Sequence, residues 1–181
     1  MIYSRKEMLK NGKACLLRNC ESSDAEEILK LWEKTHTETD FLLAYPDEKS
    51  FSVSEEEKFL EERAKNKREV EICAVVDGRI VGLAGITAIG MKEKMRHRAD
   101  FGISVMKDYW GMGVGRTLTE ACVECAKKAD YKQIELEVVA DNVSAISLYK
   151  SAGFMEYGRN PRGFRSRYTG WQELIMMRVE L

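Results

Sequence analysis

The sequence predicts an α+β fold with a central mixed, mostly antiparallel sheet of about seven strands, flanked by helices. A β-hairpin is indicated by the strand-like residues 71–76 and 79–89, because Asp77-Gly78 between them suits a type I′ turn. Only the part from strand 97–105 onward has the strand–helix–strand order of a parallel pair, so the other pairings are expected to be antiparallel. No internal repeat or linker interrupts the chain, which favours a single domain over residues 1–181.

The N-terminal quarter is expected to form a strand followed by a helix. Residues 14–20 predict the strand. Asp24 then begins a helix, because Glu27 follows at the spacing of a capping box. Apolar residues recur in this helix with the period of one buried face, at Ile28, Leu31 and Trp32.

A second helix is expected after residues 37–53, a stretch that lacks clear periodicity and contains Pro46. Ser54 and Glu57 again have capping-box spacing, and the helix is expected to run to about Asn66. The hairpin described above follows it.

The next three elements form the strand–helix–strand unit. Residues 97–105 predict a strand, residues 117–129 a helix and residues 134–139 a second strand. A glycine-rich run from Tyr109 to Arg116 separates the first strand from the helix.

The C-terminal part is expected to hold a short helix, a loop and a last strand. Asn142 caps a helix that ends near Ala152, and Gly153 suits its left-handed C-terminal cap. Residues 158–170 are rich in Gly and Arg and are expected to form a loop. Residues 174–181 predict the final strand.

Composition excludes several classes of protein. Hydrophobic residues make up 44% of the 181 residues, which is too much for a disordered chain. Charged residues make up 33%, but the net charge is -1, so a nucleic-acid-coating surface is not expected. No apolar run reaches the roughly 20 residues that span a bilayer, and residues 1–10 lack the apolar core of a signal peptide. We therefore expect a cytoplasmic protein that binds neither nucleic acid nor membrane.

The five cysteines predict neither a disulfide framework nor a metal site. Cys122 and Cys125 have the spacing of a redox or metal pair, but both fall on the apolar face of their helix and the chain has no second such pair. His36 and His97 are not at ligand spacing. We interpret the cysteines, including Cys73 in the hairpin, as buried core residues.

The glycine-rich run carries the first functional signal. A glycine-rich turn between a strand and a helix leaves backbone N–H groups free, and the helix dipole adds positive potential at the same point. This geometry binds phosphate. A dinucleotide fingerprint is one alternative, since Gly111 and Gly113 match its first two glycines, but its third glycine position holds Arg116. An acidic residue at Glu135 or Glu137 stands at a tolerable distance for that alternative.

A second motif downstream narrows the ligand. Asn142, Ala145, Leu148, Tyr149 and Gly153-Phe154 follow the strand 134–139 in the pattern N-x-x-A-x-x-L-Y-x-x-x-G-F.

Together with the glycine run, this pattern resembles the GNAT superfamily of acyl-CoA-dependent N-acetyltransferases, whose other signature is Q/R-x-x-G-x-G/A. Gly113 and Gly115 occupy its two small positions, while Trp110 stands where Gln or Arg is usual. The resemblance covers most of the chain and implies a sheet splayed between its fourth and fifth strands.

The resemblance implies acetyl-CoA as co-substrate. The pantetheine arm would pair with the backbone of the fourth strand, and an N–H there would polarise the thioester carbonyl as an oxyanion-hole donor does. Asn142 would bind the pantetheine, although a plain helix cap is also consistent with this residue. The pyrophosphate would bind the N–H groups of residues 111–116. The implied cofactor-binding residues are Ile103, Ser104, Val105, Gly111, Met112, Gly113, Val114, Gly115, Arg116, Asn142 and Tyr149.

Tyr149 is the general acid that the resemblance implies. The CoA thiol has a pKa of about 8.5 and a free phenol a pKa of about 10. The transfer of a proton from the phenol to the leaving thiolate therefore has a free energy close to zero. The alternative is that Tyr149 only packs a helical face. The general base stays open between Glu137, Asp100 and a chain of waters, and either carboxylate could instead be a solvated strand residue.

Charged residues in two segments give conflicting indications of the acceptor substrate. Acidic residues in segment 37–50 suit a cationic amine, whereas four arginines in the 158–170 segment suit an acidic acceptor, and solvated loops would explain both.

We therefore expect an N-acetyltransferase that moves acetyl from acetyl-CoA to a primary amine of a small molecule or protein, by direct attack in a ternary complex. A catalytically silent acyl-CoA-binding module is the alternative. A homodimer, common in the family, is compatible with either function.

Overall fold

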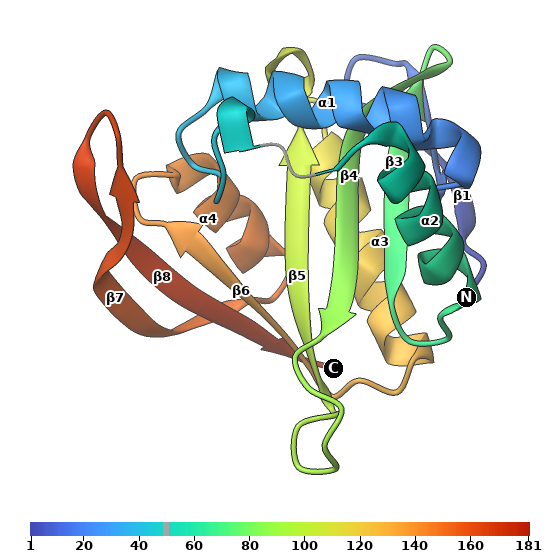
Figure 1. The fold of residues 1–181 in the computed structure, drawn as a ribbon. Coiled ribbons are helices and arrows are strands. Elements are labelled where there is room, and N and C mark those ends of the chain that lie inside the picture. Colours follow the sequence, from blue (N-terminus) through green and yellow to red (C-terminus); the bar gives the residue numbers. More distant parts are fainter. Residues whose placement is uncertain (49–50) are drawn as a thin grey trace.

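The computed structural model describes residues 1–48 and 51–181 as one curved sheet with helices on both faces (Figure 1). Its strand order is β1-β2-β3-β4-β5-β6-β8-β7, and every neighbouring pair is antiparallel except β5 and β6. The strands are β1 Ser4–Met8, β2 Ala14–Asn19, β3 Val70–Val76, β4 Arg79–Ala88, β5 Arg98–Val105, β6 Gln133–Val139, β7 Met155–Ser166 and β8 Gly170–Glu180; the helices are α1 Ala25–Glu38, α2 Val53–Lys65, α3 Val114–Lys128 and α4 Val143–Ser151.

The predicted fold class is confirmed, with one strand more than the seven expected. Helices α1 and α2 lie on one face of the sheet, and α3 and α4 lie on the other. The hairpin turn at Asp77-Gly78 has φ angles of 51° and 76°, as the type I′ prediction requires. None of the helices in the described part of the chain is long and apolar enough to cross a membrane.

Two predicted capping boxes were wrong by two or three residues, although α1 begins after Asp24 as predicted. The first capping box joins Glu21 to Asp24, ahead of α1, rather than Asp24 to Glu27. The second joins Ser52 to Glu55, whose Oε2 accepts from the Ser52 N–H at 2.8 Å, rather than Ser54 to Glu57. In both cases an acidic residue recurs near the helix start, so the spacing alone does not select the register.

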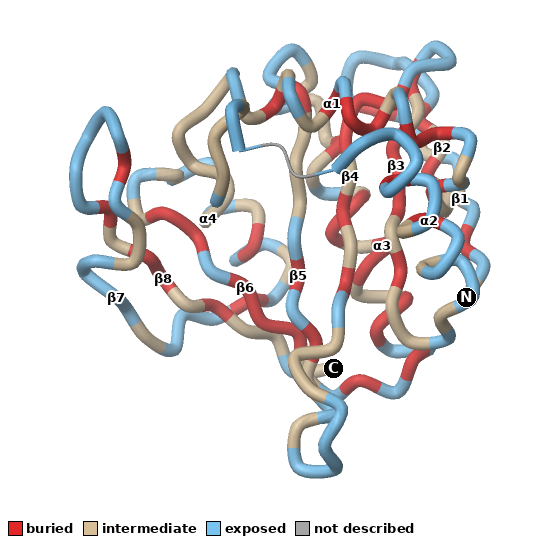
Figure 2. Tube along the Cα trace, in the orientation of Figure 1, coloured by how far each residue is buried: buried red, intermediate tan, exposed pale blue. Residues whose placement is uncertain are grey.

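Two edge strands escaped the sequence prediction. The predicted loop 158–170 is largely β7, whose side chains are mostly exposed, and its register with β8 shifts between Asn160 and Phe164 (Figure 2). Strand β1 at the opposite edge was not predicted at all. An edge strand that faces solvent on both sides needs no apolar alternation, so the period-2 signal is absent there.

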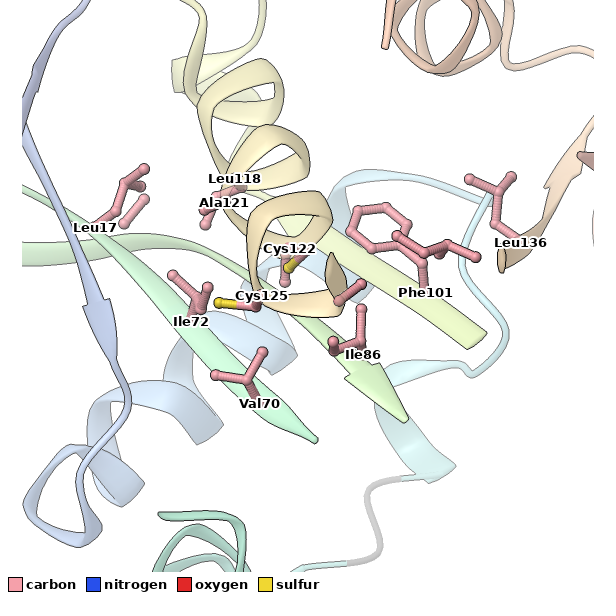
Figure 3. Packing of buried hydrophobic residues seen from close by; sticks show 14 of the residues in the cluster. Leu17, Val70, Ile72, Ile86, Phe101, Leu118, Ala121, Cys122, Cys125 and Leu136 are labelled. Atoms are coloured by element: carbon pink, nitrogen blue, oxygen red, sulfur yellow. The ribbon is translucent and has the colours of Figure 1, made fainter. Parts of the chain in front are cut away.

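The main core lies between the sheet and α3. Cys122 and Cys125 of α3 pack among apolar side chains of β2 and β3, and both are fully buried (Figure 3). Cys73 is also fully buried, in the smaller cluster beneath α1 and α2. Burial raises the pKa of the Cys122 thiol well above its usual value, which keeps this side chain protonated and unreactive. These cysteines are core residues, as predicted.

Candidate active site

Strands β5 and β6 diverge at the centre of the sheet (Figure 1). They pair from Arg98–Gln133 to Asp100–Glu135, and beyond that point Phe101–Val105 of β5 pairs only with β4. A cavity of about 350 Å³ opens in this region. Its walls come from α1, β5, the glycine run and α4, and it is lined by Lys10, Thr35, Thr39, Phe41, Leu42, Ile103, Ser104, Val105, Tyr109, Trp110, Gly111, Gly113, Gly115, Arg116, Asn142, Ser144, Ala145, Ser147, Leu148, Tyr149 and Ser151.

The glycine run turns the chain from β5 into α3. Gly111 and Gly113 have φ angles of 73° and 101°, a region that side chains other than glycine rarely adopt. Gly113 is the N-cap of α3, so the N–H groups of residues 113–116 belong to the first turn of the helix. Those groups and the N–H of Gly111 have no hydrogen-bond partner within the described residues, whereas Met112 donates to the Tyr109 carbonyl at 3.4 Å. Five of the six predicted N–H donors are therefore available.

Gly115 serves a different purpose from the two glycines before it. A Cβ at this position would lie 3.1 Å from the Leu148 side chain of α4. The lack of a side chain lets α3 approach α4 closely and places the two motifs against each other. Val114 is fully buried, so its side chain supports the helix start while only its backbone is available to a ligand.

Trp110, the departure from the usual Gln or Arg, closes the corner between β5 and the glycine run. Its indole Nε1 donates to the carbonyl oxygen of Val105 at 2.7 Å. The ring lines the cavity and remains 42% exposed. The residue therefore fixes the end of the strand that the pantetheine arm is expected to follow.

Helix α4 contributes Asn142 and Tyr149 to the same cavity. The Asn142 side-chain oxygen caps the helix by accepting from the Ala145 N–H at 3.2 Å, and its amide nitrogen has no protein partner in the described part of the chain. Tyr149 is buried and packs against Phe101 and Phe154, with ring centroids 6.1 and 5.9 Å away. Burial raises the pKa of its phenol, so Tyr149 holds its proton at neutral pH.

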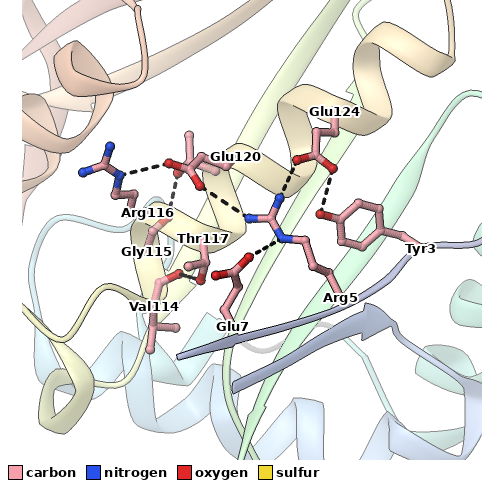
Figure 4. Close-up of polar contacts among 10 residues, drawn as sticks. Tyr3, Arg5, Glu7, Val114, Gly115, Arg116, Thr117, Glu120 and Glu124 are labelled. Carbon is pink, nitrogen blue, oxygen red and sulfur yellow. Dashed lines mark hydrogen bonds and ion pairs between the residues drawn. The ribbon is translucent and has the colours of Figure 1, made fainter. Parts of the chain in front are cut away.

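An ion-pair network holds Arg116 beside the glycine run (Figure 4). Arg116 donates through Nε to Glu120 at 2.9 Å, and Glu120 also accepts from Arg5 of β1 at 3.4 Å. Arg5 pairs in addition with Glu7 and Glu124, and Glu124 accepts from Tyr3 at 3.0 Å. The N-terminal strand thus connects to α3 through a network of five charged side chains.

The two candidate bases lie outside the cavity lining, on the opposite face of the sheet from α3. Asp100 stands directly across from Glu135, and Glu137 is two residues further along β6. Loss of hydration and then the negative charges of Glu137 and Glu135 raise the pKa of Asp100 to about 6. Glu135 is not equivalent to these two, because Arg98 pairs with it through Nε and Nη2.

The two charged segments behind the conflicting acceptor cues contact each other through Arg167, whereas Arg159 pairs with Glu156 and Glu173 instead. Arg167 pairs with Asp47 at 2.8 Å, and Ser166 donates to Asp40 at 2.6 Å, so the segment after α1 is tied to the β7–β8 turn. Residues 49 and 50 of the predicted acidic segment lie outside the described residues. The same segment contributes Thr39, Phe41 and Leu42 to the cavity, which sequence reasoning missed because it attended only to charge.

Lys10 is a second residue that sequence reasoning missed. It lies in the turn between β1 and β2, a region with no motif, and reaches the cavity only through tertiary contact. The remaining predicted residues, Met112 and Val114, belong to the glycine run without lining the cavity by their side chains.

Comparison with known proteins places these features in one family. Residues 25–154 match the model of the Acetyltransferase (GNAT) family. An N-alpha-acetyltransferase of Sulfurisphaera tokodaii is 27% identical over 182 residues, which cover 95% of this chain and 96% of that protein. The [ribosomal protein bS18]-alanine N-acetyltransferase of Escherichia coli is 35% identical over 81 residues, or 45% of this chain and 54% of that protein.

Solved structures agree with the family match. An acetyltransferase of the GNAT family from Streptococcus pneumoniae has a TM-score of 0.88 and 28% identity, over 92% of this chain and 99% of that one. A phosphinothricin acetyltransferase from Sinorhizobium meliloti in complex with acetyl-CoA has the same fold, with a TM-score of 0.80 at 16% identity, over 97% of this chain and 89% of that one. The chain belongs to the GNAT family of acetyltransferases, enzymes that use acetyl-CoA.

Proposed function

We propose that this protein transfers acetyl from acetyl-CoA to a primary amine by direct attack in a ternary complex at the splay between β5 and β6. The observation that carries the proposal is the shared cavity. It joins the free N–H groups of the glycine run, the backbone edge of Ile103–Val105 that no strand covers and the buried phenol of Tyr149. These groups match, in order, the pyrophosphate, the pantetheine amides and the leaving sulfur of acetyl-CoA.

The chemistry needs two proton transfers. The amine nitrogen bonds to the thioester carbon, and an N–H of the β5 edge stabilises the oxyanion. The C–S bond then breaks, and Tyr149 protonates the departing thiolate. Burial raises the pKa of Tyr149 and makes this phenol a weaker acid than a free one. Desolvation in the same cavity also raises the pKa of the CoA thiol and makes its thiolate a stronger base. The pKa values of the phenol and the thiol therefore stay close to each other.

The proton that the amine loses is accepted on the face of the sheet opposite α3, where the carboxylates lie. Asp100 and Glu137 are the two candidates, each acting directly or through water. Asp100 is the better suited of the two, because a carboxyl with a pKa of about 6 is mostly ionised at neutral pH and is a stronger base than an ordinary carboxylate. A protonated amine would also be attracted by the charge of Glu137, whereas the charge of Glu135 is compensated by Arg98.

The acceptor we favour is the α-amino group of a peptide. One relative is named an N-alpha-acetyltransferase and aligns along nearly the whole chain, and another is named a [ribosomal protein bS18]-alanine N-acetyltransferase. Thr39, Phe41 and Leu42 give the cavity small and apolar walls, which suit the first side chains of a peptide better than a polycation. The location in the cytoplasm stays a prediction, as does the single-domain organisation.

A thiol-release assay tests this function. Purified protein is mixed with acetyl-CoA and a panel of peptides that begin with Ala, Ser or Met, alongside free amino acids and polyamines, and products are identified by mass. We expect CoA release with at least one peptide and acetylation of its α-amino group. Tight binding of acetyl-CoA with no release from any acceptor would instead support the silent acyl-CoA-binding module.

A further inference from the structure

The turn between β1 and β2 is a well-defined element. Leu9 is buried and donates to the Lys13 carbonyl at 2.9 Å, and Gly12 donates back to the Leu9 carbonyl at the same distance. Gly12 has a φ angle of 80°, and the Asn11 side chain accepts from the Lys13 N–H at 3.1 Å. These contacts fix the positions of the two residues at the tip, Lys10 and Asn11.

That tip lies against the glycine run. The Lys10 N–H donates to the carbonyl oxygen of Met112 at 3.1 Å, and the Asn11 amide donates to the Met112 sulfur at 3.2 Å. The first of these bonds joins the backbone of the turn directly to the backbone between Gly111 and Gly113. The Arg5 network described above ties the same strand, β1, to α3. The turn is therefore held in place relative to the free N–H groups.

Lys10 differs from the nearby Lys13 in its ion pairing and in its position relative to the cavity. Lys13 pairs with Asp77 at 2.6 Å, and its side chain does not line the cavity. Lys10 lines the cavity together with Gly111, Gly113 and Arg116, and within residues 1–48 and 51–181 no carboxylate forms an ion pair with it. Lys10, which has no ion-pair partner among the described residues, thus lines the same cavity as a set of free backbone donors at a helix N-terminus.

We propose that Lys10 is a phosphate-binding residue for acetyl-CoA, supplied by the β1–β2 turn. Its ammonium adds a charge-assisted contact to the donors of the glycine run, so the N-terminal hairpin completes the co-substrate site rather than only extending the sheet. The inference rests on the proposed function to the extent that acetyl-CoA must bind at the glycine run, but it does not depend on the acceptor. The shared chemistry is a phosphate, of either the pyrophosphate or the ribose.

Calorimetric titration with CoA tests the proposal. Lys10→Met removes the charge and keeps the aliphatic stem, and Lys13→Met is the matched control from the same turn. We expect about tenfold weaker binding of CoA to the first variant and less than a twofold change for the second, with Lys10→Arg close to the wild type. Equal affinities for Lys10→Met and Lys13→Met would overturn the proposal. Failure of the wild type to bind CoA would instead refute the proposed function.

Two further titrations separate a charge effect from a packing effect and identify the phosphate. In 1 M KCl the gap between the wild type and Lys10→Met should shrink, since salt screens an exposed ion pair. A gap that stays the same would show a packing role and contradict the proposal. With 3′-dephospho-CoA, a persisting tenfold loss assigns Lys10 to the pyrophosphate, and a vanished loss assigns it to the ribose phosphate. Unchanged thermal unfolding of the unliganded variants serves as the folding control.

Discussion

The indole Nε1 of Trp110 donates to the carbonyl oxygen of Val105 at 2.7 Å, and this bond joins the last residue of β5 to the start of the glycine run. Both residues line the same cavity. The family pattern has Gln or Arg where this chain has Trp110. In this chain, the hydrogen bond from Trp110 holds the end of the splayed strand β5 in position. It ties the pantetheine edge to the phosphate-binding turn.

Replacement of Trp110 by Phe should therefore weaken acetyl-CoA binding more than it weakens the fold. The ring is partly exposed, so the loss in stability should be about 1 kcal/mol, the worth of one hydrogen bond. We expect the KM for acetyl-CoA to rise about three- to tenfold with kcat little changed. Trp171→Phe, at an exposed tryptophan of β8, is the matched control. Equal KM values for the two variants would argue against the positioning role.

Gly113 should not tolerate a side chain. Its φ of 101° places it in the left-handed region, where a Cβ costs about 1–2 kcal/mol. Gly113→Ala should lower the melting temperature and also weaken CoA binding, because the N–H groups that follow would turn away from the ligand. Gly102→Ala is the control, since a Cβ there would meet no atom within 4 Å. Chemical denaturation and CoA titration measure the two effects; a loss of stability without loss of CoA affinity would contradict the donor role.

Asp100 should control the pH dependence of the reaction. If it is the base, kcat/KM rises with pH through about 6 and then levels, because the ionised carboxylate is the active form. Asp100→Asn should remove this step and lower kcat/KM at least tenfold. Glu137→Gln is the parallel variant: should the step disappear there and persist in Asp100→Asn, Glu137 is the base instead. A profile unchanged in both variants would leave the water chain as the proton path.

Glu71 should make stability fall with pH. Its carboxylate lies across β4, where a Cβ on Gly85 would come within 2.4 Å of it, and burial raises its pKa to about 7. In the unfolded chain a Glu titrates near about 4.3, so the folded protein binds the extra proton between these values. Stability is therefore greatest below the unfolded value and declines up to about pH 7.

Glu71→Gln should remove this decline. At pH 8 the variant should be more stable than the wild type by on the order of 1–3 kcal/mol, and near pH 4 the two should differ little. Urea unfolding at the two pH values measures the difference. A stability gap that is the same at both pH values would rule out ionisation of Glu71 as its cause.

The sequence predicted the elements whose signals are local. The Asp77-Gly78 turn, the glycine run before α3 and the Asn142 cap are each encoded within a few residues, and the structure has all three. Tyr149 could be placed in the cavity because its helix motif fixes its distance from Asn142. The two edge strands were missed because solvent on both faces removes the apolar alternation.

The parts of the site that were missed depend on contacts between distant segments. Lys10 reaches the glycine run across about a hundred residues of chain, and no pattern around it predicts that contact. Phe41 and Leu42 reach the cavity because Asp40 is tied to Ser166 of β7. Sequence reasoning recognised charge on both of those segments but could not show that Arg167 pairs with Asp47.

The kcat of Tyr149→Phe tests the central claim most directly. Phe keeps the aromatic contacts with Phe101 and Phe154 and removes only the hydroxyl. We predict that kcat falls about 100-fold or more, while the KM for acetyl-CoA stays within about threefold and the melting temperature is unchanged. A Tyr149→Phe variant that acetylates the best acceptor at the wild-type rate would contradict the account of Tyr149 as the proton donor at the splay.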